Sequence, residues 1–159
     1  MNKIYLLLGS NIGDSQLQLS VAIKYIEQKI GAVMRQSKLY STAAWGDTRQ
    51  PDFLNQVIIV ETALTPLETM QTILAIEKEM GRVRTLKNAP RIIDIDILFF
   101  NKMVMDETML TLPHPEIQNR RFVLIPLNEL TPNLNHPVLG LSVHQLLKIC
   151  PDRLTVKKF

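Results

Sequence analysis

The hydrophobic positions of the chain change their spacing several times, and each spacing predicts one kind of element. Residues 4–8 form a short apolar run that a glycine ends, which is typical of a buried strand. From residue 15 to residue 30, apolar side chains recur at helical spacing after Asp14, a favourable N-cap residue, and Gly31 is the predicted stop signal. We therefore expect a strand and then a helix at the start of the chain.

The next part of the chain predicts two strands joined by a long loop. Residues 33–40 are mostly polar and predict a strand near an edge, whereas residues 53–62 predict a strand with an apolar centre. Residues 41–52 between them have no periodicity and include Trp45. A loop of this length suggests a function of its own, such as a lid.

A second helix is predicted after the third strand. Residues 65–68 combine a capping box with a proline at the first helical position, and Gly81 ends the periodic segment. Glu77 falls in the middle of the apolar arc of this helix. Its carboxylate either pairs with one of the arginines that follow the helix or reaches solvent through a roll of the helix, and both alternatives stay open.

Residues 89–100 predict a loop that carries Arg91 and then enters a strand. Apolar side chains are expected to share one face of it: Ile93, Ile95, Ile97 and Phe99. Asp94 and Asp96 then lie side by side on the other face, where two carboxylates repel each other unless a cation lies between them. Mg²⁺ prefers such oxygen ligands, although an Asp-x-Asp pair alone also fits an ordinary solvated strand face.

The predicted order is strand, helix, strand, strand, helix, strand. This order is typical of an α+β, ferredoxin-like βαββαβ core, with an antiparallel sheet and both helices on one face. The aspartate pair would lie on the opposite face, which the C-terminal segment could cover. In that segment we expect a short helix around residues 142–148, and Pro126 predicts a kink or two short pieces in a helix begun at Arg120.

Composition is that of an ordinary soluble protein, and we expect one domain over residues 1–159. Hydrophobic residues make up 46% of the chain and charged residues 21%. The net charge of +3 is too small to indicate nucleic-acid binding. Cys150 is the single cysteine, so no intrachain disulfide can form, and no apolar run reaches membrane-spanning length. We expect a cytoplasmic protein.

The distribution of charge is more informative than its sum. Four basic residues lie within ten positions directly before the aspartate pair: Arg82, Arg84, Lys87 and Arg91. Positive charge beside acidic metal ligands indicates a polyanionic ligand such as phosphate, and the combination favours phosphoryl transfer. No glycine-rich phosphate loop is present in the sequence, so side chains and loop backbone would hold any nucleotide. His114, between two prolines, could reach a phosphate.

Several separated motifs together resemble the 6-hydroxymethyl-7,8-dihydropterin pyrophosphokinase family of the folate pathway. The matching segments are residues 8–11, 50–55, 81–84 and 90–98, and then Pro113-His114, Asn119-Arg120 and Phe122. The resemblance implies transfer of a pyrophosphoryl group from ATP to the hydroxymethyl oxygen of the pterin, which releases AMP and gives the pterin diphosphate. It also implies the ferredoxin-like core and small-molecule substrates. We further expect a monomer, and neither nucleic acid nor membrane as a partner.

Roles for individual residues follow from the same resemblance. Asp94 and Asp96 would bind two Mg²⁺ ions that bridge the ATP phosphates. The implied catalytic residues are Arg82, Arg84, Arg91 and Asp96. The implied ATP contacts are Glu77, Arg84, Arg91, Ile97, Thr111, His114 and Arg120. In the implied pterin site, Phe53 and Phe122 sandwich the ring, and the other contacts are Thr42, Ala43, Trp45, Asn55 and Asp94.

This sequence departs from the family pattern at some positions. Phe53 stands where many members have tyrosine, and Asn88-Ala89 stand where many have Trp-Gly. Three further departures leave the adenine and ribose contacts open: Leu74, Met109 and Pro115.

Two other functions compete with this interpretation. A two-metal phosphohydrolase or nuclease usually draws on more carboxylates than one pair. A ferredoxin-like module that binds RNA or a small effector would present aromatic side chains on its central strands, whereas the predicted face presents acid.

Overall fold

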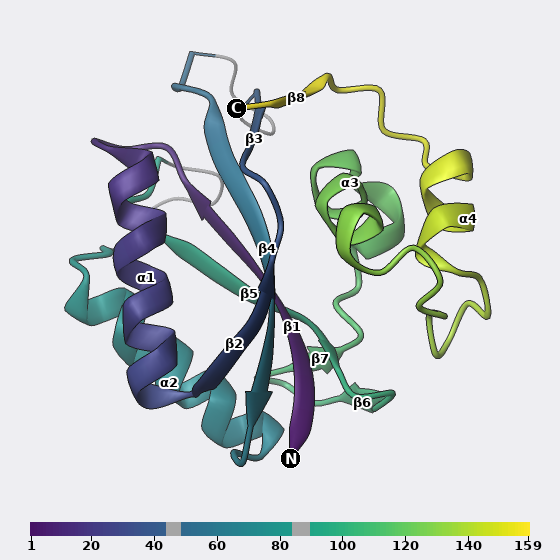
Figure 1. Ribbon diagram of the computed structural model, residues 1–159, viewed down its shortest axis with the longest axis horizontal. Coiled ribbons are helices and arrows are strands. Elements are labelled where there is room, and N and C mark those ends of the chain that lie inside the picture. Colours follow the sequence, from purple (N-terminus) through teal and green to yellow (C-terminus); the bar gives the residue numbers. More distant parts are fainter. Residues whose placement is uncertain (44–48, 84–89) are drawn as a thin grey trace.

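The computed structural model describes residues 1–43, 49–83 and 90–159, which form an α+β fold (Figure 1). The described strands are β1 (Asn2–Ser10), β2 (Gly31–Gln36), β3 (Tyr40–Thr42), β4 (Phe53–Thr62), β5 (Asp94–Phe100), β6 (Met105–Asp106), β7 (Thr111–Leu112) and β8 (Val156–Lys158). The described helices are α1 (Ser15–Lys29), α2 (Pro66–Glu79), α3 (Arg121–Leu130), α4 (Val143–Ile149) and a short 3₁₀ turn at Ile117–Asn119.

The described strands form one large antiparallel sheet and one small one. The large sheet has the order β5-β1-β4-β3-β8, and β2 also pairs with β4. Helices α1 and α2 cover one face, and α3 and α4 cover the other (Figure 1). Strand alternation supplies both cores, because Leu6 and Leu8 face α1 and α2 while Tyr5 and Leu7 face α3.

The predicted helix starts are confirmed. Asp14 caps α1 by accepting a hydrogen bond from the Leu17 N–H at 3.1 Å. The capping box at Thr65 is formed, with its side chain bonded to the N–H of Glu68 and the Glu68 carboxylate bonded back to the N–H of Thr65.

Helix α1 ends at Lys29 with Ile30 as its C-cap, directly before Gly31 as predicted, and Gly31 has a further role. It is the first residue of β2, and a Cβ atom there would lie 1.9 Å from the carbonyl oxygen of Glu61. The position needs glycine because β2 and β4 approach each other closely. Gly81 follows α2 with φ +94°, so its position ends that helix as predicted.

The strand predicted over residues 33–40 is in fact two shorter strands, β2 and β3. The Ser37 hydroxyl between them accepts a hydrogen bond from the Val57 N–H at 3.0 Å, so a side chain replaces the backbone partner and the ladder is interrupted. The predicted loop over residues 41–52 therefore begins after Thr42, and its residues 44–48 lie outside the described part of the chain.

The faces of β5 switch between Ile97 and Phe99. Ile95 and Ile97 lie in the core with α1 and α2, as predicted, but Phe99 lies in the core with α3. The expectation that Phe99 shares the isoleucine face is wrong, because the pairing skips one residue: Leu6 pairs with Ile97 and Tyr5 with Phe99. One extra residue in a strand reverses the alternation beyond it.

The C-terminal segment covers the second face of the sheet, as expected. Of the two predicted outcomes, a kink or two short pieces, the second is not found, because the helix at Arg121–Leu130 continues through Pro126. The short helix after Ser142 is confirmed, and that serine caps it. Within the described ranges, no helix is long and apolar enough to cross a membrane.

Candidate active site

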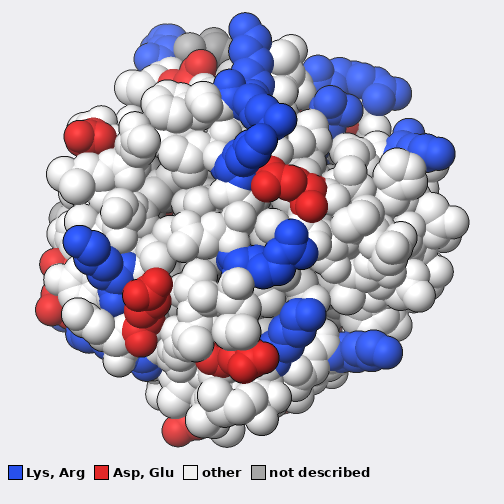
Figure 2. Space-filling model, in the orientation of Figure 1, with Lys and Arg blue, Asp and Glu red and all other residues white. Residues whose placement is uncertain are grey.

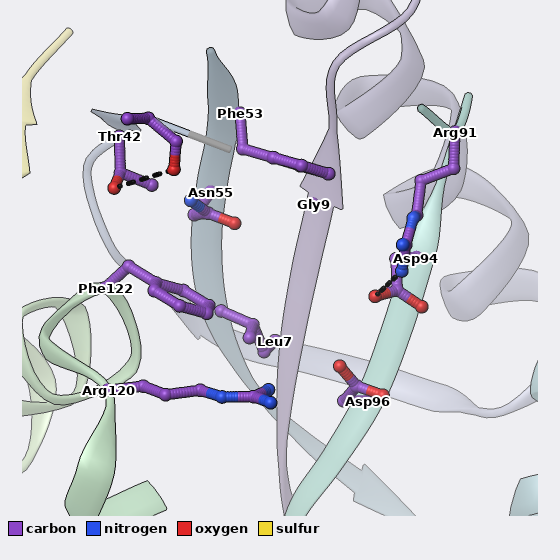
Figure 3. Close-up of a pocket in the computed structure, with 11 residues that line it drawn as sticks. Leu7, Gly9, Thr42, Phe53, Asn55, Arg91, Asp94, Asp96, Arg120 and Phe122 are labelled. Atoms are coloured by element: carbon purple, nitrogen blue, oxygen red, sulfur yellow. Dashed lines mark hydrogen bonds and ion pairs between the residues drawn. The ribbon is translucent and has the colours of Figure 1, made fainter. Parts of the chain in front are cut away.

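The aspartate pair lies on β5, on the sheet face that α3 partly covers. Gly9 pairs with Asp94 and Leu7 with Asp96 across the β1–β5 ladder. Beyond β1, Asn55 of β4 faces the same space, and α3 begins beside it (Figure 3). The predicted alternation of isoleucine and aspartate therefore places both carboxylates in a cleft between the sheet and α3.

Two arginines hold the carboxylate of Asp94. Nη1 of Arg82 lies 2.7 Å from Oδ1, and Nη1 of Arg91 lies 3.1 Å from Oδ2. The Arg82 side chain is only 10% exposed, so Arg82 holds Asp94 from the buried side of the site. Arg91 enters from the loop that precedes β5 and points down onto Asp94 (Figure 3).

Glu77 pairs with an arginine and is not solvated, which decides between the two alternatives that the sequence left open. Its Oε2 atom lies 2.8 Å from Nη1 of Arg82 and accepts a hydrogen bond of 2.8 Å from the Ile95 N–H. The residue is 2% exposed. Glu77 thus connects α2 to β5 and to the guanidinium that holds Asp94.

Asp96 lies two residues after Asp94 on β5, and the pKa of its carboxyl is strongly raised. Desolvation first, and then the charges of Asp94 and Glu77, raise the pKa of its carboxyl to about 8, against the opposing effect of Arg120 and Arg82. The Arg120 side chain extends from the start of α3 across the cleft towards it (Figure 3). A carboxyl in this environment favours a bound cation.

The cleft brings together most of the residues implied for the pterin. Its lining includes Thr42, Ala43, Phe53, Asn55, Asp94 and Phe122, together with Leu7, Gly9, Arg91, Asp96 and Arg120. The Phe53 ring comes from β4 and the Phe122 ring from α3, with Asn55 between them in the view of Figure 3. The Arg91 guanidinium lies 5.7 Å from the centre of the Phe53 ring, and that of Arg120 lies 5.8 Å from the centre of the Phe122 ring.

A second cavity adjoins the cleft along the outer side of β5. Its lining residues are Met70, Ile95, Asp96, Ile97, Thr108, Met109, Leu110, Thr111, His114 and Pro115. It therefore holds three of the residues implied for ATP, namely Ile97, Thr111 and His114. Because Asp96 lines both cavities, a group transferred between two ligands bound in them would pass beside its carboxylate.

His114 is arranged as a neutral hydrogen-bond donor. Its Nδ1 atom accepts a hydrogen bond from the Glu116 N–H at 3.1 Å, so in the neutral ring the proton lies on Nε2. Burial and, second, the charge of Arg120 lower the pKa of its imidazole. Its backbone N–H is bonded to the carbonyl oxygen of Leu98 at 2.9 Å, which fixes the residue beside β5.

The donors in the cleft fit magnesium bound together with phosphates. Asp94 and Asp96 supply two carboxylates on one strand face, and in the described ranges no group of three or more His, Cys, Asp or Glu side chains is placed to hold an ion. Mg²⁺ is commonly bound by one or two carboxylates with substrate phosphates and water, rather than by an all-protein cage. The pair therefore suits an ion that arrives with a polyphosphate.

Asn11 joins three segments of the site, and the sequence predicted no role for it. Its backbone N–H donates to the Arg91 carbonyl oxygen at 3.1 Å, and its side-chain oxygen accepts from the Arg91 N–H at 2.9 Å. Its side-chain nitrogen donates to Gln50 at 3.0 Å and to the carbonyl oxygen of Pro51 at 3.1 Å. The signal in the sequence that could have indicated this role is a polar residue directly after a buried strand.

Two implied residues lie outside the described part of the chain, Trp45 and Arg84, and so does Lys87. Their roles stay predictions. Positive charge is also not confined to the site: Figure 2 shows Lys and Arg side chains spread over this face and gathered near its top, around β3 and β8, with Asp and Glu among them.

Comparison with known proteins gives consistent matches. The family model of 7,8-dihydro-6-hydroxymethylpterin-pyrophosphokinase matches residues 5–132. A 2-amino-4-hydroxy-6-hydroxymethyldihydropteridine pyrophosphokinase of Methylorubrum extorquens is 42% identical over 135 residues, which cover 84% of this chain and 85% of that protein. The enzyme of that name from Pseudomonas aeruginosa is 38% identical and covers 95% of this chain and 93% of its own length.

Longer proteins match as well. The folic acid synthesis protein fol1 of Schizosaccharomyces pombe is 41% identical over 96% of this chain, which spans only 21% of that protein. The crystal structure of Plasmodium falciparum HPPK-DHPS with pteroate has a TM-score of 0.77 over 92% of this chain and 44% of that one, at 19% identity, and so supports the fold. From the family model and the relatives of similar length, we conclude that the chain belongs to the 7,8-dihydro-6-hydroxymethylpterin-pyrophosphokinase family.

Proposed function

We propose that this protein transfers the pyrophosphoryl group of ATP to the hydroxymethyl oxygen of 6-hydroxymethyl-7,8-dihydropterin, giving AMP and the pterin diphosphate for folate biosynthesis. Family membership supports the reaction. The single structural observation that carries the proposal is the pair of adjoining cavities that share Asp96, one of them lined by two aromatic rings.

The aromatic cleft suits the pterin. Phe53 and Phe122 offer two ring faces from opposite sides, and a flat heteroaromatic ring is well held by stacking. The side-chain nitrogen of Asn55 is buried, and no partner is recorded for it among the described residues. A buried donor without a partner is costly, so a polar edge of the pterin would satisfy it. Thr42 and Ala43 lie along the same side.

The second cavity suits the nucleotide. Ile97, Thr111 and His114 line it on the outer side of β5, and the neutral imidazole of His114 offers its Nε2 proton to a phosphate oxygen. Glu77 would act on this cavity indirectly, because its carboxylate accepts hydrogen bonds from the Ile95 N–H and the Arg82 guanidinium. We therefore propose that Glu77 shapes the nucleotide site through β5.

The transferred group would lie beside Asp96, where the two cavities join. Asp94 and Asp96 would hold two Mg²⁺ ions, which when bound would neutralise the phosphate charge and orient the phosphates for in-line attack. Arg91 and Arg120 enter this place from opposite sides, from the loop before β5 and from the start of α3. Their guanidinium groups would bind the equatorial oxygens, where charge spreads in the transition state.

Arg82 would contribute indirectly, since its guanidinium is engaged by both Glu77 and Asp94. Arg84 and Trp45 lie outside the described residues, so their roles are proposed from the sequence alone. We propose from the sequence that the loops at residues 41–52 and 82–91 close over both substrates. Arg91, which leads from one of these loops into β5, would then contribute mainly to the transition state.

We further propose a ferredoxin-like core, a monomer that acts in the cytoplasm as a single domain, and only small molecules as substrates. The strand order β5-β1-β4-β2 with α1 and α2 on one face supports the core arrangement. The single buried, free cysteine, Cys150, agrees with a reducing compartment.

Product analysis tests the proposal directly. The protein is incubated with Mg²⁺, ATP and the pterin alcohol, and the products are separated by chromatography. We expect AMP and pterin diphosphate in equal amounts, and no AMP when the pterin is left out. Free inorganic phosphate without pterin diphosphate would instead indicate a phosphohydrolase.

A further inference from the structure

The segment 152–159 touches both walls of the aromatic cleft without lining it. One wall carries Phe122 on α3, and the other is made by Thr42 of β3 and Phe53 of β4. In Figure 1 the segment leaves α4, passes α3 and reaches β3 as β8. The match to the family model ends at residue 132, before this segment begins.

The first contact is at the start of α3. Oδ2 of Asp152 accepts a hydrogen bond of 3.0 Å from the N–H of Arg121, the first residue of the helix, and Oδ1 accepts one of 2.9 Å from the Leu154 N–H. The N-cap residue, Arg120, makes no side-chain capping bond of its own. Asp152, only 8% exposed, therefore supplies the cap from another part of the chain.

The second contact is the β3–β8 ladder. Val156 pairs with Thr42 and Lys158 with Tyr40, and the Phe159 N–H donates to the carbonyl oxygen of Leu39 at 2.9 Å. On its other edge β3 pairs with β4, which sets Thr42 opposite Phe53. Strand pairing thus joins the wall formed by Thr42 and Phe53 to β8. Asp152, at the other end of the same segment, attaches that segment to α3.

The two ends of α3 are fastened independently. Near its C-terminal end, the carboxylate of Glu129 accepts hydrogen bonds from the Tyr40 hydroxyl at 2.6 Å and from the Lys38 N–H at 3.1 Å. Loss of the Asp152 contacts would therefore weaken the attachment of the start of the helix, where Arg120 and Phe122 lie, and leave its other end attached to β3.

We propose that residues 152–159 act as a brace that sets the distance between the two walls of the pterin cleft, with Asp152 as the positioning residue at one end and β8 at the other. The proposal rests on the function proposed above. The brace holds Phe122 and Phe53 ready to stack on the ring before the ligand arrives, so it contributes to pterin affinity. It does not touch the cavity along β5 that is assigned to the adenosine part of ATP.

Titration calorimetry of the full chain tests the brace with two ligands, 6-hydroxymethyl-7,8-dihydropterin and adenosine monophosphate, an ATP analogue without the two transferred phosphates that Arg120 would bind. In Asp152→Ala we expect the pterin Kd to rise about tenfold, while the Kd of the analogue changes by less than about threefold. Asp152→Asn should fall between this variant and the wild type, because an amide keeps one acceptor where the carboxylate has two.

Thr65→Ala is the matched control for loss of a helix cap. It removes the capping bond of α2, which follows Thr62, the end of β4 opposite to Phe53. The melting temperature should fall in this variant as in Asp152→Ala, but both ligand affinities should be those of the wild type. Equal weakening of pterin and analogue in Asp152→Ala would overturn the brace, and so would an unchanged pterin Kd.

A second pair of variants tests the other end of the brace, also if Asp152→Ala does not fold. The N–H of Phe159 faces β3, so by strand alternation the N–H of Lys157 does too, and Lys157→Pro removes it. We expect weaker pterin binding in Lys157→Pro and wild-type binding in Lys157→Thr, which loses only an exposed side chain. Equal pterin affinity in the two variants contradicts the proposal. A wild-type protein that binds no pterin would refute the proposed function itself.

Discussion

Replacement of Glu77 tests whether the buried network beneath the site has the importance that its geometry indicates. Glu77 is 2% exposed and bonds both the Arg82 guanidinium and the Ile95 N–H at 2.8 Å. In Glu77→Gln the amide oxygen can still accept from both groups, because both bonds go to Oε2, and Arg82 keeps Asp94 at 2.7 Å, so the loss is the negative charge that strengthens the bond with Arg82. We expect this variant to lose about 1.5–3 kcal/mol of unfolding free energy.

Glu77→Ala should cost more, because it also leaves the Ile95 N–H buried without its acceptor. Removal of one partner from a buried, hydrogen-bonded ion pair costs about 3–5 kcal/mol. Urea unfolding followed by far-ultraviolet circular dichroism measures the loss. We expect the midpoint to shift to lower urea with an unchanged slope, since the surface exposed on unfolding stays the same.

The same helix offers a matched control. Glu79 forms an ion pair of 2.7 Å with Lys29, but the two side chains are 48% and 39% exposed. Glu79→Ala should therefore cost no more than about 1 kcal/mol, as is usual for exposed pairs. If the Glu77 and Glu79 variants were equally stable, the reasoning from burial would be refuted.

Three further predictions follow from individual contacts. Gly31→Ala should lower the unfolding free energy by about 1–3 kcal/mol in urea unfolding, because the new Cβ would meet the carbonyl oxygen of Glu61 and push β2 away; wild-type stability would contradict the close approach. Arg91→Ala should lower kcat by about ten- to a hundredfold in steady-state kinetics, as expected for a charged contact made in the transition state; a change in the KM of ATP alone would argue against that role. Burial and, second, the contacts with Glu129 raise the pKa of Tyr40 from 10.0 to about 12. Because the folded pKa lies above the unfolded one, this group contributes stability below pH 10 that is lost between about pH 10 and pH 12. In Tyr40→Phe that part of the alkaline loss should disappear, and the tyrosinate absorbance step near pH 12 should disappear with it.

Local signals in the sequence predicted the elements that hold the chemistry. Asp14 and Thr65 begin helices as their capping patterns indicate, and the alternation of isoleucine with Asp94 and Asp96 predicted the face on which both carboxylates lie. These features depend on residues close together in the chain, so spacing was enough to find them.

Features that depend on contacts between distant segments of the chain could not be predicted from the sequence. The bulge near Leu98 could not be seen, because residues 97–100 are all apolar and either alternation buries them. The pairing of β3 with β8 joins two strands of three residues each, too short to show a period. Asp152 carries no motif, and its importance appears only when its carboxylate meets the start of α3.

The structure of the protein with Mg²⁺, a non-hydrolysable ATP analogue and the pterin bound would test most directly where the reaction takes place. We expect the pterin ring between Phe53 and Phe122, the adenosine beside Ile97, and the phosphates between them against Asp94 and Asp96. A pterin bound outside the cleft, or phosphates directed away from the two aspartates, would contradict this expectation.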